Sequence, residues 1–204
     1  MFLHLIFIYI VIVLSAVIHE YAHGFVAYQL GDSTAKDSGR LTINPIAHID
    51  PMGTVLVPLL FMTLSGVFIG WAKPVPYNPL NLRDKRYGSL KVAIAGPASN
   101  FLIALVLGGI MRLVLAGVLP FVASQQFIDL VGLVVFVNIF LALFNLIPLP
   151  PLDGSKVLAD LVPSLARGLY QIGFIGLFLA LLLAFYVLGP VAQMLFTIIT
   201  GVGI

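Results

Sequence analysis

Cysteine is absent from the 204-residue chain, so disulfides and thiolate metal ligands are excluded. Any metal ion must therefore be held by histidine and carboxylate side chains. Charge is also scarce: charged residues make up 9% of the sequence, against about 25% in soluble domains. The net charge of +2 is too small to indicate nucleic acid as a partner. These deficits exclude an ordinary soluble domain.

Apolar residues take the place of the missing charge. They make up 61% of the chain, and the mean hydropathy is +1.14. This composition predicts an all-α, multi-pass membrane protein, a helical bundle with about four to six membrane segments in the lipid bilayer. We expect residues 1–204 to form a single membrane domain. The first apolar run has no Lys or Arg before it and no small-residue cleavage site after it, which predicts a retained helix and not a cleaved leader.

Apolar runs and helix breakers predict where the segments lie. The first helix should run from Phe2 to about Leu30 and stop at the turn residues that follow. Further membrane helices are expected at residues 90–119, 127–147 and 170–188, with Gly189-Pro190 breaking the last of them. Residues 191–203 are short for a crossing, so the sequence leaves open whether they cross.

The region between the first helix and residue 90 is less regular. A short stretch after Arg40 could be a strand, and residues 54–69 are apolar but interrupted by Pro58, which favours a re-entrant segment over a span. Residues 70–88 are proline-rich, which predicts an extended, β-like segment. It ends in a basic cluster that places this loop in the cytoplasm. The N-terminus would then lie outside the cell membrane.

The motif HEYAHG, residues 19–24, lies near the end of the first apolar run. Histidines four positions apart on a helix differ by about 40° in direction, so His19 and His23 can bind one metal ion. Glu20, about 100° from His19, can face a water bound to that metal. This is the arrangement of a zinc hydrolase, in which the metal lowers the pKa of water and the carboxylate takes its proton.

The place of Glu20 within an apolar membrane helix supports a functional interpretation of this residue, which is the only glutamate in the chain. A carboxylate near the bilayer centre costs about 2.5 kcal/mol or more, so one is retained there mainly for function. His19 lies about 26 Å along the helix from Phe2, which places the site inside the membrane but near the cytoplasmic face. The alternative is a chance HExxH whose side chains pair with backbone or headgroups.

A zinc ion held by two histidines needs a third protein ligand from elsewhere in the chain. The candidates in or near the bilayer are His48, Asp50, Asp129 and Asp153. Asp153 is the best placed, because its helix returns to the face of the membrane where His19 lies. Its alternative role is an N-cap for the helix that begins near Gly154. Asn145 could stabilise an oxyanion or hold a substrate carbonyl, or could make an interhelical hydrogen bond.

Taken in order, the motifs HEYAHG, GRLTINPIAHIDPMGT, GWAKPVPYNP, AGPASN and NLIPLPPLDG resemble the site-2 protease family of intramembrane zinc metalloproteases (M50-type). The resemblance runs from Ser15 to Lys156. It implies that His19, His23 and Asp153 bind one Zn²⁺ per chain, that Glu20 is the general base and that Asn145 assists.

The resemblance also implies a substrate class: transmembrane helices of other membrane proteins, cut near the cytoplasmic side. The chain resembles the short members, without a PDZ or CBS domain, which leaves open a regulatory membrane partner or a homo-oligomer.

Two groups of residues are expected to support such a site. The extended stretch from Trp71 to Asn78, with Val75 and Tyr77 between them, could pair with an unwound substrate strand, or could be a structural loop. His48 and Asp50 could line a polar path for water, or could brace the loop in which they lie.

Two other functions remain open from the sequence. Buried His and Asp also mark ion pathways, so a metal or proton transporter is the alternative, although neither half of the chain repeats the other. A silent relative that only binds membrane proteins is less favoured, because every expected catalytic residue is present.

Overall fold

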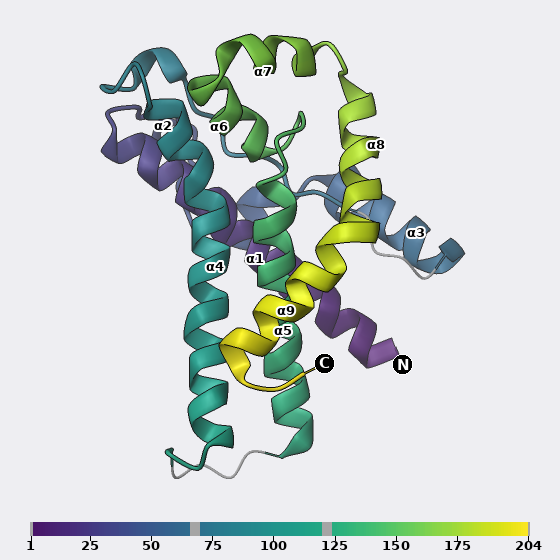
Figure 1. The fold of residues 1–204 in the computed structure, drawn as a ribbon. Coiled ribbons are helices and arrows are strands. Elements are labelled where there is room, and N and C mark those ends of the chain that lie inside the picture. The colour runs from purple at the N-terminus through teal and green to yellow at the C-terminus, as the bar shows by residue number, and fades with distance from the viewer. Residues whose placement is uncertain (1, 66–69, 120–123, 204) are drawn as a thin grey trace. The chain divides into compact units, whose positions relative to one another are not determined.

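The computed structural model describes residues 2–65, 70–119 and 124–203, and these residues are mainly helical, with no β-strand among them (Figure 1). Contacts divide the chain into two compact units, residues 1–96 and 97–204.

The first unit contains one long helix, several short helical turns and the beginning of a second long helix. Its elements are α1 (Phe2–Gln29), α2 (Thr34–Asp37), η1 (Pro45–His48), η2 (Pro51–Leu56), α3 (Val57–Ser65), η3 (Pro79–Asn81) and α4 (Gly88–Leu115). The predicted first helix is confirmed: α1 is followed by Gly31, whose φ of 104° is favourable only for glycine.

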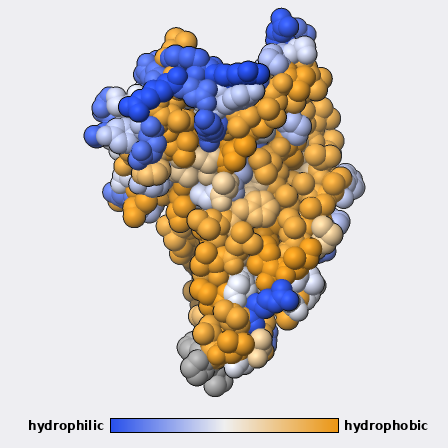
Figure 2. All heavy atoms as spheres, turned by 60° about the vertical axis from the view of Figure 1, so that its left-hand side comes forward, coloured by the Kyte–Doolittle hydropathy of each residue, from blue (hydrophilic) through white to orange (hydrophobic). Residues whose placement is uncertain are grey.

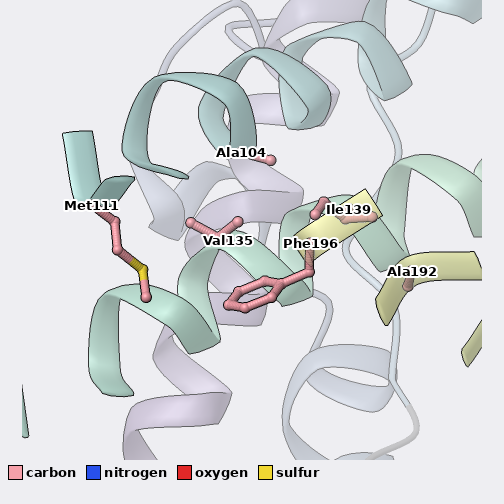
Figure 3. Packing of buried hydrophobic residues seen from close by; sticks show 6 residues of the cluster. All are labelled: Ala104, Met111, Val135, Ile139, Ala192 and Phe196. Atoms are coloured by element: carbon pink, nitrogen blue, oxygen red, sulfur yellow. The ribbon is translucent and has the colours of Figure 1, made fainter. Parts of the chain in front are cut away.

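The second unit contains the rest of α4 and the helices that follow it. These are α5 (Gln125–Asn145), α6 (Asp153–Leu161), α7 (Pro163–Tyr170), α8 (Phe174–Leu183), η4 (Ala184–Leu188) and α9 (Gly189–Thr200). Its main core is apolar and is formed by Ala104, Met111, Val135, Ile139, Ala192 and Phe196, which come from three helices (Figure 3). A polar pair is buried in the same unit, where Asn100 Nδ2 donates to Asn138 Oδ1 at 2.8 Å.

Four helices are long and apolar enough to cross a membrane. They are Leu3–Gln29, Gly88–Leu115, Gln125–Asn145 and Ile175–Thr200. Apolar side chains also cover most of the surface visible in Figure 2. A water-exposed surface of this kind would be unfavourable, whereas lipid solvates it, so the chain is an integral membrane protein.

The predicted break at Gly189-Pro190 is wrong. The last candidate span extends from Ile175 to Thr200, so residues 191–200 belong to this candidate span and are not a separate short segment. Helix α8 passes into the π-helical turn η4, and Pro190 lies in the first turn of α9. The irregular turn η4 lies where the missing proline N–H would otherwise break the hydrogen-bond ladder, so the helical path continues past Pro190.

The β-like region between α1 and α4 also differs from expectation. The stretch after Arg40 is formed of bends and not a strand, and residues 70–78 lie outside any helix or strand. Residues 54–69 belong largely to η2 and α3, while 66–69 lie outside the described residues. The apolar helix here, Pro51–Phe61, is shorter than the four candidate spans.

The turn after α1 is held together by Asp32, whose side chain is 0% exposed. Its carboxylate accepts hydrogen bonds from the Thr34 hydroxyl at 2.5 Å, from the backbone of Thr34 at 3.2 Å and of Asn78 at 2.6 Å, and from the side chain of Asn81 at 2.9 Å. Burial alone would raise the pKa of Asp32, but these hydrogen bonds outweigh it and lower the pKa below its ordinary value. The carboxylate therefore ties the far end of the 70–78 segment to the turn that follows α1.

We expect Asp32→Asn to destabilise the protein by about 1–3 kcal/mol at neutral pH, because the amide leaves buried donors without an ionised acceptor. Since the pKa is lowered in the folded state, the advantage of the wild type is complete above about pH 4, the ordinary Asp value, and is lost as the pH falls through the folded-state pKa. Thermal unfolding of both proteins in detergent across this range measures the difference. The exposed Asp37→Asn is the control, and an equal loss there would contradict the assignment.

Candidate metal centre

Helix α1 brings the two histidines of HEYAHG to one point. The Nε2 atoms of His19 and His23 lie 3.0 Å apart, and both residues are buried, at 6% and 7% exposure. Two nitrogen ligands of a tetrahedral zinc ion, each at 2.0–2.1 Å, would be separated by about 3.3 Å. With Glu20, which is half-buried, the ligand atoms all lie within 4.8 Å of one another. The spacing of the pair therefore fits a shared ion.

The second helix of the same unit orients the ring of His23. Its Nδ1 lies 2.7 Å from the carbonyl oxygen of Val92 in α4. A carbonyl can only accept a hydrogen bond, so Nδ1 is the donor, and in the neutral imidazole this leaves the lone pair on Nε2, the atom that faces His19. A histidine that ligates a metal usually donates its other N–H in this way.

Gly96 lies one helical turn beyond Val92 and faces the same pair of histidines. A Cβ atom at this position would lie 2.4 Å from His23 Nε2 and 2.5 Å from His19 Nε2. Such contacts are far below van der Waals distance, so only glycine leaves the space beside both nitrogen atoms open. An ion at 2.0–2.1 Å from both needs such space. The open space beside Gly96 and the two imidazole nitrogen donors together fit a zinc ion.

The 70–78 segment is fixed to the rest of the unit through alternate N–H groups. Trp71 donates to the carbonyl of Gly53 at 3.0 Å, and Lys73 donates to the carbonyl of His48 at 3.0 Å. Val75 donates to Glu20 Oε2 at 2.7 Å. These N–H groups are therefore engaged inside the unit, and the contacts favour a supporting role for the segment over an open edge for substrate.

Tyr77 and Asn78 complete the segment. Tyr77 packs against the small apolar cluster of Ala27, Leu82 and Val92. Asn78 donates its backbone N–H to Asp32 and caps η3 with its side chain, which accepts from Leu80 N at 3.0 Å.

His48 and Asp50 have the contacts of residues that brace a loop. His48 is 1% exposed, and its Nε2 lies 2.8 Å from the carbonyl oxygen of Thr42. Asp50 caps η2 by accepting from the backbone of Met52 at 2.9 Å and of Gly53 at 3.1 Å. Neither belongs to the cluster formed by His19, Glu20 and His23.

Asn145 and Asp153 lie in the second unit. Asn145 is the last residue of α5, is half-buried and donates to the carbonyl of Leu141 at 3.0 Å. Asp153 is 5% exposed and forms an ion pair with Lys156 at 3.0 Å. Leu152 holds the N-cap position of α6, so Asp153 lies inside the first turn and does not occupy the capping position of the alternative interpretation.

Gly154 explains the tight turn in front of α6. A Cβ atom on it would lie 2.3 Å from the carbonyl oxygen of Leu146 and 2.5 Å from that of Ile147. Only glycine therefore allows the chain that follows α5 to pass against the start of α6. This close approach positions Asp153 within the second unit.

Sequence reasoning missed Gly96 and Asp32. Gly96 is part of AGPASN, whose small residues indicate close helix packing, but the motif does not say which side chains lie opposite. Asp32 follows Gly31, and in the sequence it has the pattern of an ordinary turn residue. In both cases the partners are distant in the chain, so a single sequence carries little signal for them.

Comparisons with known proteins find a peptidase family and relatives named as zinc metalloproteases. The model of a family described as Peptidase family M50 matches residues 114–189. YwhC of Bacillus subtilis (strain 168), whose name assigns it provisionally to the zinc metalloproteases, is 41% identical over 165 residues, which are 79% of this chain and 71% of YwhC.

Two further relatives carry a name of the same kind. Rip2 of Mycolicibacterium smegmatis is 32% identical over 76% of this chain and 58% of its own length. Rip2 of Mycobacterium tuberculosis (strain ATCC 25618 / H37Rv) is 31% identical over 76% of this chain and 57% of its own length. The chain thus spans little more than half of the Rip2 proteins. No solved structure is significantly similar to it.

Proposed function

The chain belongs to peptidase family M50, the site-2 protease family, and on that premise we propose that it is an intramembrane zinc endopeptidase. It would hydrolyse peptide bonds within or near transmembrane helices of other membrane proteins. The observation that carries the proposal is the His19–His23 pair, with Nε2 atoms 3.0 Å apart and Glu20 beside them, in a helix apolar enough to span a membrane. An intramembrane carboxylate next to such a pair indicates chemistry on a membrane-embedded substrate.

The proposed roles follow from the donor types. His19, His23 and Asp153 would hold zinc, because neutral imidazole and carboxylate are its ligands in a chain without cysteine. When bound, zinc supplies the Lewis acidity that lowers the pKa of water and polarises a carbonyl. Glu20 takes the proton from the attacking water and delivers it to the departing amine. Asn145 would assist at the substrate carbonyl.

A substrate helix must also change shape before it can be cut. Its carbonyl groups are hydrogen-bonded internally, so a stretch near the scissile bond has to unwind before water can attack. Water must reach the site from the cytoplasmic face, near which we place it. We propose that residues 1–204 form one protease domain of the cell membrane.

Cleavage of a membrane-embedded reporter helix by the purified protein tests the proposal. We expect cleavage that a zinc chelator reduces to background and that added zinc restores, because the two histidines cannot activate water alone. Mass spectrometry of the products gives the cut position, which should lie within or next to the reporter's apolar stretch. Protein that holds zinc but cuts no reporter in a panel, and that moves zinc or protons across liposomes, would be a transporter and not a protease.

A further inference from the structure

We propose that the backbone N–H of Val75 orients Glu20, and that close packing of the Val75 side chain on Gly24 holds this N–H within reach of the carboxylate. This inference rests on the proposed function, in which Glu20 is the general base. The contact itself is short: Val75 N lies 2.7 Å from Glu20 Oε2, a distance typical of a charge-assisted hydrogen bond.

Val75 contacts α1 in two ways. While its N–H reaches Glu20, its side chain, which is 7% exposed, packs on Gly24. A Cβ atom on Gly24 would lie 2.9 Å from Val75 Cγ1, and also 3.2 Å from Ala35 Cβ and 3.3 Å from Leu41 Cδ1. Glu20 and Gly24 are four positions apart and share one face of α1. The absence of a side chain on Gly24 therefore lets the segment approach closely enough for the hydrogen bond to form.

The donor is held at this position by contacts on both sides. Lys73 N donates to His48 O at 3.0 Å, and Asn78 N donates to Asp32 Oδ2 at 2.6 Å. Arg40 adds a hydrogen bond from Nη2 to the carbonyl of Lys73 at 2.6 Å. The Val75 N–H therefore cannot shift along α1 unless these contacts break.

The sequence around the donor makes it specific. Pro74 and Pro76 carry no N–H, so in this run of three residues only Val75 can donate to a carboxylate. Their fixed φ angles also stiffen the backbone on either side. A carboxylate with one oxygen held in this way is restricted in rotation, and its second oxygen is left to take the proton from water. Loss of this orientation can slow the reaction by up to about 100-fold.

The test compares glycine-to-alanine variants of the full chain. We expect Gly24→Ala to lower kcat by about 10- to 100-fold with little change in KM and with wild-type zinc content, because the added methyl pushes Val75 away from Glu20. Gly24→Ala combined with Val75→Ala removes the clashing methyl groups and should recover a large part of kcat. The control is Gly109→Ala in α4, where a Cβ atom meets nothing within 4 Å. No fall in kcat for Gly24→Ala would overturn the proposal.

A second measurement reads the contact directly and does not depend on cleavage. In zinc-loaded protein labelled with ¹⁵N-valine, the Val75 amide should exchange slowly with solvent and resonate downfield, and Glu20→Ala should abolish both properties. An unchanged Val75 signal in Glu20→Ala would show that this hydrogen bond is not formed in solution. If the wild type cut no reporter but the Val75 signal responded as expected, the proposed function would fail while the contact stood.

Discussion

Glu20→Gln is expected to slow cleavage of the reporter helix by about 10²- to 10⁴-fold while the protein keeps its zinc. Glutamine has nearly the same shape as glutamate and can still accept a hydrogen bond from Val75, but its amide cannot take a proton from water. The two histidines are untouched, and their Nε2 atoms stay 3.0 Å apart. The measurement is single-turnover cleavage together with the zinc content of the same preparation.

Asp129→Asn is the matched control for Glu20→Gln, because it makes the same change of carboxylate to amide in another candidate span. Asp129 is exposed and its Oδ1 accepts from Gln125 at 2.8 Å, so this variant should cut at the wild-type rate. A Glu20→Gln variant that retained full turnover would rule out a general base at this position and would favour the transporter.

Gly96→Ala is expected to abolish zinc binding, and cleavage with it. The added methyl would lie within 2.5 Å of both Nε2 atoms, so it would take the space that the ion needs and force the imidazoles apart. Alanine is a better helix former than glycine by about 1 kcal/mol, so a weakened α4 cannot account for the loss. Zinc content after equilibration with excess metal measures metal binding, and circular dichroism measures whether the helices are intact.

The control for Gly96→Ala is Gly109→Ala, which lies in the same helix and has open space around it. It should retain both zinc and activity. Stoichiometric zinc in Gly96→Ala would mean that the histidine pair does not hold the metal beside α4. Gly24 and Gly96 thus have separable effects, since Gly24→Ala should impair turnover and Gly96→Ala should prevent metal binding.

Local patterns in the sequence predicted much of the fold. The spacing of HEYAHG predicted that His19 and His23 lie on one face of α1, because helical periodicity is a local property. The apolar runs similarly predicted the first three candidate spans. Pro190 misled the prediction of the last one, because a proline breaks a helix only when an internal N–H is needed. A π-helical turn just before Pro190 places it in the first turn of α9.

Contacts between distant residues could not be predicted in the same way. The sequence offered two roles for Val75 and could not choose between them, because the choice depends on which oxygen its N–H reaches, 55 positions away. The contact of Gly96 with the histidines could not be predicted either, because the small residues of AGPASN are compatible with any close helix packing. A single sequence shows composition and periodicity, whereas contacts between residues far apart in the chain depend on the folded backbone.

The hydrogen bond from His23 to Val92 has a consequence for assembly in the membrane. It joins two candidate spans through a side chain that we propose as a metal ligand, and Gly96 brings the backbone of α4 against the same nitrogens. If His23 binds zinc, the free energy of metal binding would therefore include part of the free energy of packing the start of α4 on α1. Bound zinc would then stabilise the contact between these two helices as well as supply the chemistry, and the protein's thermal stability would rise with zinc concentration.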